Sequence, residues 1–342
     1  MYRVSAIFVR PLLFAAAVAA ATVSAVAGGA VAGELKLAHW VSPMHPMDRL
    51  FMRPWTKEIA KMSGGALTIR TYPGGELGAG GAAQFKRAVD GIADITWGLQ
   101  GYTSSVFPRT TLVEMPAIAR DSPDLVRRLW AVFDKWIAPE YRRVKVLALW
   151  VGEAPVFMSR NKPIRTLDDL KGMKIRTPSA AQAGLLKALG ATPVAIDAAK
   201  MYQALETGQV DALFVPPSTI RSFKLAEVAR YFTTGLPFGR SPFFTVMNRK
   251  AYESLPPQHK ALIDGTTGAA WSAKATAIYE KAGAGGLALV RKSGKHQIFA
   301  FSAADEKRGR AILLEARAQI LAQKEKQGVP ARAIVAAMEA AN

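Results

Sequence analysis

Short runs of alternating or β-branched residues near the start of the chain are separated by stretches with helical spacing. The segments 35–38, 67–72 and 94–98 are predicted as strands, because each is bounded by turn residues. Between them, 47–62 and 82–90 carry apolar residues at helical spacing and end at glycines. The order β-α-β-α-β predicts a parallel sheet flanked by helices.

The same pattern starts again after a predicted helical stretch at residues 122–141. Predicted strands and helices then follow one another in a second β/α unit, with strands at 144–151, 155–159, 174–177 and 210–215 and helices at 180–189 and 201–207. A further strand at 243–248 is placed to return to the first unit. From residue 257 onward the pattern is mainly helical, with one strand-like piece at 296–301.

The N-terminus has the layout of a secretory signal peptide. Arg3 and Arg10 give it positive charge without any acidic residue, and an apolar stretch ends at small-x-small sites around Ala27 and Ala32. The alternative is a retained membrane anchor, but the small residues and the change to mixed polar sequence at Glu34 favour cleavage. We therefore expect residues 1–32 to be removed after export, so that the mature protein is periplasmic.

These features predict an α/β fold with two lobes, the clamshell of a periplasmic binding protein, in which each lobe is a β-sheet flanked by helices. Lobe I is expected to span 33–150 with the return segment 240–256, and lobe II to span 151–239. Residues 257–342 are expected to form a mainly helical C-terminal region that packs on the lobes. Ligands in such sheets bind outside the carboxyl ends of the strands.

Composition narrows the function classes. The chain has 342 residues and no cysteine, so neither disulfides nor thiolate chemistry operates. Its formal net charge is +19, which raises nucleic acid as a partner. The basic residues are dispersed, however, and an exported protein rarely meets nucleic acid. A solvated basic surface is the simpler interpretation, and attraction of an anionic ligand is the second.

The sequence contains none of the familiar catalytic or metal-binding motifs. It lacks a nucleophile elbow, a Walker loop and a zinc-protease helix motif, and its glycine-rich stretches lack phosphate-binding spacing. His39 and His45 lie six positions apart beside prolines, which is a poor metal pair. We therefore expect no enzymatic activity, no metal and no cofactor, although a periplasmic enzyme or a sensor on the same fold stays an alternative.

Several short motifs occur in a fixed order that resembles one family, the solute receptors of tripartite ATP-independent periplasmic (TRAP) transporters, the C4-dicarboxylate-receptor-like family. They are Leu35-Lys36-Leu37-Ala38-His39, Tyr72-Pro73-Gly74-Gly75-Glu76-Leu77-Gly78, Pro163-Ile164-Arg165-Thr166-Leu167-Asp168-Asp169-Leu170-Lys171-Gly172-Met173-Lys174-Ile175-Arg176, Leu189-Gly190-Ala191-Thr192-Pro193 and Met201-Tyr202-Gln203-Ala204-Leu205-Glu206-Thr207-Gly208. The resemblance covers roughly residues 35 to 265, and the order of the motifs makes it specific.

The resemblance implies a receptor that binds a small organic carboxylate and delivers it to a small and a large membrane subunit. It also implies an arginine on a strand of the second lobe that forms a bidentate salt bridge to the ligand carboxylate, and Arg176 stands at that position. A guanidinium is a planar donor fork that fits a carboxylate and stays charged. Without the resemblance, Arg176 is as readily a surface residue of a basic protein.

Two departures from the family pattern bear on the ligand. No arginine occurs around Glu153 and Phe157, where the family often has a second one. Phe214 and Val215 stand where the family tends to carry a polar Glu-Asn pair. A cleft with fewer polar partners is poorly suited to a sugar acid, because each buried unpaired hydroxyl costs about 1–3 kcal/mol.

We therefore expect an aromatic or hydrophobic monocarboxylate or a 2-oxo acid as the ligand, with a dicarboxylate as the alternative. The predicted binding residues are Arg176, Phe214, Trp97, Trp150, His39, Gln100, Phe157 and Val215, and Trp40, Tyr102, Phe238 and Phe243 are further candidates. For each aromatic residue the competing interpretation is simple core packing.

Overall fold

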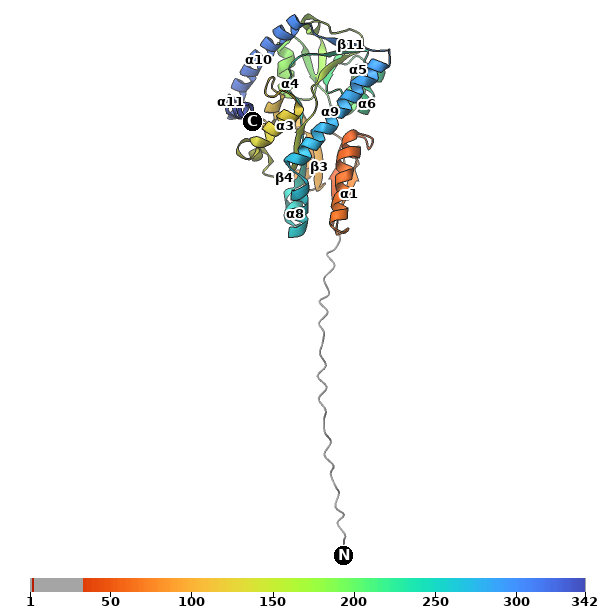
Figure 1. Ribbon diagram of the computed structural model, residues 1–342, viewed down its shortest axis with the longest axis vertical. Helices are drawn as coiled ribbons and strands as arrows, with labels where there is room; N and C mark the ends of the chain where they lie inside the picture. Colours follow the sequence, from red (N-terminus) through yellow and green to blue (C-terminus); the bar gives the residue numbers. More distant parts are fainter. Residues whose placement is uncertain (1, 3–32, 342) are drawn as a thin grey trace. The chain divides into compact units, whose positions relative to one another are not determined.

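The computed structural model describes residue 2 and residues 33–341. The predicted signal peptide at 1–32 thus lies outside the described residues, apart from position 2. The described part forms one compact unit of two β-sheets with helices around them, as Figure 1 shows. Among residues 33–341, no helix combines the length and the apolar character needed to cross a membrane.

The first sheet, here called sheet A, has five strands in the order β2-β1-β3-β10-β4. Its strands are β1 (Gly33–Ala38), β2 (Leu67–Tyr72), β3 (Ile95–Leu99), β4 (Val144–Val151) and β10 (Pro242–Asn248). β1 pairs in parallel with β2 and β3, as the β-α-β-α-β pattern predicts. β10 comes from much later in the sequence and lies antiparallel between β3 and β4.

The second sheet, here called sheet B, has six strands in the order β11-β9-β5-β8-β6-β7. They are β5 (Val156–Ser159), β6 (Lys174–Thr177), β7 (Thr192–Ala195), β8 (Ala212–Val215), β9 (Tyr231–Thr234) and β11 (Gln297–Ala300). β5 runs antiparallel to β8 and β9, whereas β6 is parallel to β7 and β8. Strands β7 and β9 have no strong sequence signal, because their apolar positions are short and interrupted by proline or threonine.

Helices and short helical turns cover both sheets. On the sheet A side they are η1 (Met47–Met52), α1 (Arg53–Met62), α2 (Gln84–Val89), η2 (Gln100–Thr103), η3 (Thr110–Glu114), α3 (Ser122–Ala131), η4 (Phe133–Ile137), η5 (Ala138–Tyr141), α7 (Arg249–Glu253) and α8 (Pro257–Thr266). On the sheet B side they are η6 (Leu167–Leu170), α4 (Ala180–Ala188), η7 (Ala198–Lys200), α5 (Met201–Glu206), α6 (Thr219–Ser222) and η8 (Leu225–Glu227).

The C-terminal region adds three helices. They are α9 (Ala269–Lys292), α10 (Ala303–Lys326) and α11 (Ala331–Ala340). α9 contacts η1, α3 and β4 on the sheet A side and α6 and β11 on the sheet B side, so it runs along both (Figure 1). The glycine-rich stretch 283–286 lies inside this continuous helix. Gly283 and Gly286 pack directly on Glu153 and on the Pro217 carbonyl, where a Cβ would clash, so close approach explains why glycine stands at these positions.

Two apolar clusters pack against the two faces of sheet B. Phe157 and Phe214 pair across β5 and β8 and belong to the larger cluster, which continues into sheet A. Leu213 and Val215 belong to the smaller cluster on the opposite face. Side chains alternate along a strand, so this division follows directly from the pleat. Adjacent residues of β8 therefore face opposite sides of sheet B.

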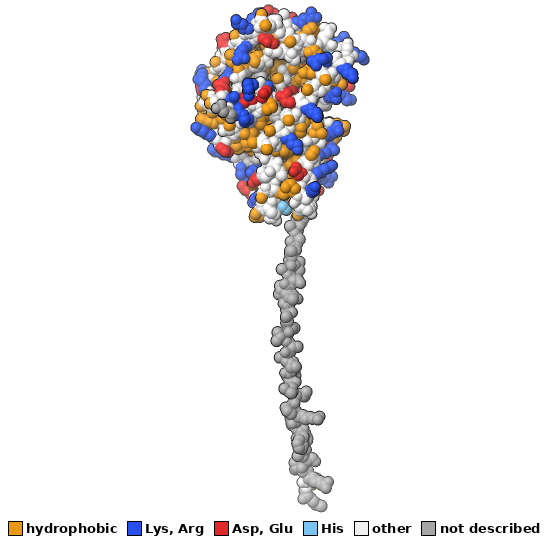
Figure 2. All heavy atoms as spheres, in the orientation of Figure 1, with side chains coloured by type: hydrophobic (Ala, Val, Ile, Leu, Met, Phe, Trp, Pro, Cys, Tyr) orange, Lys and Arg blue, Asp and Glu red, His pale blue; other side chains and the backbone are white. Residues whose placement is uncertain are grey.

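Charged side chains are spread over the surface. On the face seen in Figure 2, Lys and Arg side chains lie scattered among acidic and apolar ones rather than in one continuous patch. This distribution agrees with the dispersed basic residues of the sequence and with a solvated surface.

Candidate ligand-binding site

A cavity lies between the two sheets, at the carboxyl ends of their parallel strands. It contains about 500 Å³ of space between atoms, part of it open to solvent. Its walls come from the segments that follow β1, β3, β6 and β8, together with the start of β10 and helix α9. The lining residues are Trp40, His45, Leu99, Tyr102, Gly152, Arg176, Pro178, Ala198, Met201, Val215, Pro216, Ser218, Thr219, Phe223, Ser241, Phe243 and Tyr279. This is where ligands bind in open α/β sheets.

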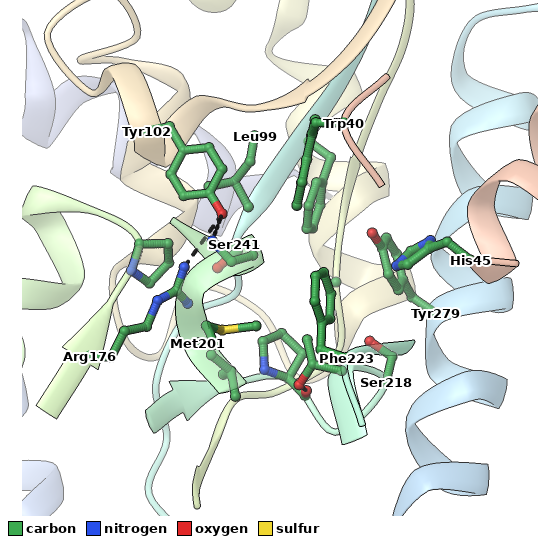
Figure 3. Close-up of a pocket in the computed structure, with 17 residues that line it drawn as sticks. Trp40, His45, Leu99, Tyr102, Arg176, Met201, Ser218, Phe223, Ser241 and Tyr279 are labelled. Carbon is green, nitrogen blue, oxygen red and sulfur yellow. Dashed lines mark hydrogen bonds between the residues drawn. The ribbon is translucent and has the colours of Figure 1, made fainter. Parts of the chain in front are cut away.

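Arg176 is the one basic residue, Lys or Arg, among these lining residues. It lies on β6 between β7 and β8 and is 2% exposed. Its Nε donates to the Ile196 carbonyl at 2.8 Å, and its Nη2 donates to the Tyr102 hydroxyl at 3.4 Å (Figure 3). Within residues 33–341 no carboxylate pairs with it. Burial lowers the pKa of this guanidinium, yet an arginine keeps its charge. The cavity therefore has one buried cation without a salt-bridge partner, on which the Asp197 carboxylate acts only at longer range.

Tyr102 connects the two sides of the cavity. It belongs to η2, directly after β3 of sheet A, and its hydroxyl also accepts the backbone N–H of Ala198 at 2.9 Å. Burial raises the pKa of Tyr102 to about 12, so the hydroxyl stays protonated. A second link is the N–H of Gly81, which donates to the Asp197 carboxylate at 3.2 Å. These bonds hold the segment after β7 against the sheet A side.

An aromatic wall forms one side of the cavity. Trp40 stacks on Trp97 with ring centroids 5.6 Å apart and lies 6.3 Å from Phe223. Phe243 stacks on Tyr279 at 5.1 Å and on Trp150 at 5.7 Å. Planar rings at these separations make a flat apolar surface suited to another ring.

The predicted site residues divide into two groups. Arg176 and Val215 line the cavity, and so do the further candidates Trp40, Tyr102 and Phe243. Register explains the first pair: Arg176 pairs with Leu213, which lies two residues before Val215 on the same face of sheet B. The resemblance to the receptor family thus points to a residue that faces the cavity.

The other predicted residues lie behind the lining. Trp97 and Trp150 are fully buried and support Trp40 and Phe243 from below. Gln100 donates to the Tyr141 hydroxyl at 3.0 Å, and His39 pairs with Asp48 at 3.1 Å, so both polar groups bond within the protein. The sequence gives no sign of these partners, because each pair is brought together by tertiary packing.

Phe214 and Phe157 do not line the cavity, contrary to the sequence prediction. Their rings contact each other at 5.0 Å, and Phe214 contacts Phe238 at 4.4 Å, in the core on the far face of sheet B. The reason is alternation: Val215 faces the cavity, so its neighbour Phe214 points to the opposite side. The sequence prediction included both Phe214 and Val215, and of these two adjacent residues Val215 is the one that lines the cavity.

Several lining residues have no clear sequence signal. Ser218, Thr219 and Phe223 follow β8, where the Pro216-Pro217 turn marks a strand end but not its function. Tyr279 comes from the middle of α9 in the C-terminal helical region. Helical spacing places Tyr279 on the buried face of α9, but only the packing of that helix across both sheets brings it to the cavity.

Two sheets with a solvent-connected cavity between them and a buried arginine facing that cavity are the architecture of a solute-binding protein. Groups of three or more potential metal ligands are absent from the residues described. The chain belongs to the DctP family, bacterial extracellular solute-binding protein family 7, whose model matches residues 37–324. The two-sheet α/β fold class and the resemblance to TRAP solute receptors are thereby confirmed.

Relatives of known sequence and structure support this family assignment. A solute-binding protein of Albidiferax ferrireducens is 30% identical over 255 residues, which are 69% of this chain and 73% of that protein. A TRAP solute-binding protein of Rhodoferax ferrireducens, solved with copurified benzoate, superposes with a TM-score of 0.86 at 27% identity, covering 90% of this chain and 97% of that one. A marine metagenome TRAP protein specific for aromatic acids, solved with 3-hydroxybenzoate, also gives 0.86 at 26% identity, covering 90% of this chain and 97% of that one.

Proposed function

We propose that this chain is the periplasmic receptor of a TRAP transporter for an aromatic or hydrophobic monocarboxylate, or a 2-oxo acid. The ligand carboxylate pairs with Arg176 inside the cavity between sheets A and B. The observation that carries the proposal is the buried guanidinium of Arg176, which faces a cavity and has no carboxylate partner among the described residues. Leaving such a charge unpaired is costly, and a ligand carboxylate would relieve that cost.

The apolar wall supports an aromatic or hydrophobic body for the ligand. Trp40, Phe223 and Phe243 offer ring faces, while the hydroxyls of Ser218, Thr219 and Ser241 are few for a polyhydroxylated acid. Proteins solved with benzoate and with mandelate, at 27% and 25% identity to this chain, point the same way. A protein solved with galacturonate is 18% identical and supports the fold alone.

A dicarboxylate is the second candidate, and the cavity lining argues against it. Arg176 is the only Lys or Arg among the lining residues described above. A second carboxylate would be removed from water without a cation to receive it, which is strongly unfavourable. We therefore place monocarboxylates ahead of dicarboxylates.

The test is a thermal-shift screen of residues 33–342 against small carboxylates, with the Arg176→Ala variant alongside. A micromolar ligand at millimolar concentration stabilises the folded protein by about 4 kcal/mol. Benzoate-like acids should raise the melting temperature of the wild type and leave Arg176→Ala unshifted. The matched control is Lys174→Ala, which removes an exposed charge from the same strand and should respond like the wild type. Stabilisation by succinate-like acids with aromatic acids inert would overturn the ligand class.

We further propose that the signal segment 1–32 is cleaved. Lobe I (33–150 with 240–256) and lobe II (151–239) then close around the ligand, and the closed protein docks on a small and a large membrane subunit. Uptake of the labelled acid into vesicles that contain both subunits should require this protein. Recovery of the acid chemically unchanged after incubation would separate a receptor from a periplasmic enzyme, and failure of uptake despite tight binding would favour a sensor.

A further inference from the structure

The end of the cavity away from Arg176 is formed by His45 and Tyr279. In Figure 3 these two side chains lie together on one side of the cavity and Arg176 lies on the other, with Trp40 and Phe223 between them. The rings of His45 and Tyr279 meet edge to face with centroids 6.2 Å apart. His45 comes from the loop before η1, and Tyr279 from α9.

The position of the proton on His45 follows from its contacts. The backbone N–H of Met47 donates to Nδ1 at 3.2 Å, so Nδ1 is an acceptor. Burial lowers the pKa of His45 to about 3, aided by the nearby ring of His39. The neutral ring therefore carries its single proton on Nε2, which makes Nε2 a hydrogen-bond donor.

Tyr279 offers a second donor. Burial holds the pKa of its hydroxyl well above 10.0, and the nearby Glu153 acts in the same direction. The ring is fixed by stacking on Phe243 at 5.1 Å. Within residues 33–341, neither the hydroxyl of Tyr279 nor Nε2 of His45 has a protein acceptor at hydrogen-bonding distance. Both donors line the cavity, so a ligand atom can receive them.

The electrostatic surroundings at this end disfavour a second anion. Glu153 lies directly after the lining residue Gly152 and accepts the N–H of Ser218 at 2.5 Å. A Cβ at Gly283 would lie 2.8 Å from Glu153 Oε1, so this carboxyl packs on the helix that carries Tyr279. Burial raises the pKa of Glu153 to about 7, with Glu280 contributing, so negative charge is already unfavourable here.

We propose that His45 and Tyr279 form a neutral recognition subsite that selects aromatic monocarboxylates bearing an uncharged acceptor group, such as a hydroxyl, methoxy or carbonyl, at the end away from the carboxylate. This inference rests on the proposed function, because it takes Arg176 as the partner of the carboxylate. It goes further in naming the second point of recognition. Arg176 fixes one end of the ligand by charge, and the two donors fix the other without charge.

The experiment measures dissociation constants by calorimetry for benzoate, 3- and 4-hydroxybenzoate, and benzene-1,3- and benzene-1,4-dicarboxylate. In the wild type, at least one hydroxybenzoate should bind about 3–10 times more tightly than benzoate, which is the contribution of one neutral hydrogen bond. Both dicarboxylates should bind at least about 10 times more weakly than the better hydroxybenzoate, because no cation receives their second charge.

Three substitutions locate the preference. Tyr279→Phe removes one oxygen, and His45→Asn keeps an acceptor for the Met47 N–H but removes the donor at the Nε2 position. Each should bring the hydroxybenzoate-to-benzoate affinity ratio towards one, because the lost donor acts on the added hydroxyl and not on the ring. His45→Gln retains a donor at the Nε2 position and should retain the preference. Tyr202→Phe, which changes a surface tyrosine bonded to Glu227, is the matched control.

The two proposals fail differently. If benzoate binds the wild type but the ratio is the same in Tyr279→Phe and His45→Asn, the subsite is wrong and the receptor function stands. If a dicarboxylate binds most tightly, the neutral character of the subsite is wrong. If no acid of the set binds the wild type, both the aromatic ligand class and the subsite are overturned.

Discussion

The hydroxyl of Tyr102 lies 3.4 Å from Nη2 of Arg176, so a residue that follows a strand of sheet A meets the buried cation of sheet B. The same hydroxyl accepts the N–H of Ala198. Tyr102 therefore orients the guanidinium and holds the two sides of the cavity together. Its position links the proposed ligand-binding arginine to the sheet A side of the cavity.

Tyr102→Phe should weaken binding of the aromatic acid about 5-fold or more, chiefly through faster dissociation. The reason is that the ring is kept while two hydrogen bonds across the cavity are lost, each worth about 0.5–1.5 kcal/mol. Stopped-flow fluorescence with the cavity tryptophans gives both rate constants. Tyr252→Phe, whose hydroxyl bonds Asp264 on the surface, should leave them unchanged. An equal change in the rate constants of both variants would contradict the role of Tyr102 in joining the two sides of the cavity.

Arg176→Met should abolish binding without lowering the melting temperature of the unliganded protein. A buried guanidinium with no anionic partner costs free energy in the empty cavity, and an apolar side chain of similar length removes that cost. Calorimetric melting with and without ligand measures both quantities. Arg176→Lys keeps the charge but loses the planar fork, so its affinity should fall about 10-fold or more. A large loss of stability in Arg176→Met would mean that the residue is structural.

Glu114 should make the protein less stable as the pH rises from about 6.5 to 8. This side chain accepts hydrogen bonds from Ser179 and Gln182, and burial raises its pKa from 4.5 to about 8. Between these values the folded state holds a proton that the unfolded state releases, so its stabilisation is complete below the unfolded pKa and is lost as the pH passes the folded one. The loss is about 1.4 kcal/mol per pH unit up to the folded pKa of about 8, or about 2 kcal/mol between pH 6.5 and 8, and no further loss follows above that pKa.

Urea unfolding at several pH values measures this effect. Glu114→Gln keeps the hydrogen-bonding shape without titrating, so its stability should be nearly constant between pH 7 and 9, above the pKa of about 7 of the buried Glu153. His45 acts in the opposite sense at lower pH, because its pKa is lowered to about 3 and the unfolded state takes up the proton first. Between about pH 4.5 and 6.5 the effects of Glu114 and His45 on stability oppose each other, so the loss due to Glu114 should be seen most clearly between about pH 6.5 and 8. A wild-type profile that is flat above pH 6.5 would contradict the role of Glu114.

Phe214→Leu should lower the free energy of unfolding by about 1 kcal/mol and leave ligand affinity unchanged, because its ring packs on Phe157 and Phe238 and not in the cavity. Phe243→Leu makes the same chemical change in a lining residue and should weaken binding. Chemical denaturation and ligand titration of both variants give the comparison. If Phe214→Leu affects affinity more than Phe243→Leu, the assignment of faces on sheet B is wrong.

Most of the fold is encoded locally. The strands at 35–38, 67–72 and 174–177 and the helices between them follow from alternation, helical spacing and glycine or proline boundaries, and the structure forms them at nearly those positions. The order of the motifs also identified the family and pointed to Arg176, because members of one family share the same short sequence motifs. The dispersion of the charged residues was likewise visible in the sequence alone.

The tertiary structure alone decided which side chains meet at the cavity. Choosing Val215 over Phe214 needs the register of β8 against β5 and β6, since a shift of one residue reverses every face. Placing Tyr279 beside His45 needs α9 to cross both sheets, and no local pattern of a helix specifies its distant neighbours. The sequence by itself determined most of the elements, the family and the candidate arginine, because these depend on near neighbours in the chain and on the order of short motifs. The shape of the cavity and its neutral far end depend on contacts between residues far apart in the chain, which only the folded packing fixes.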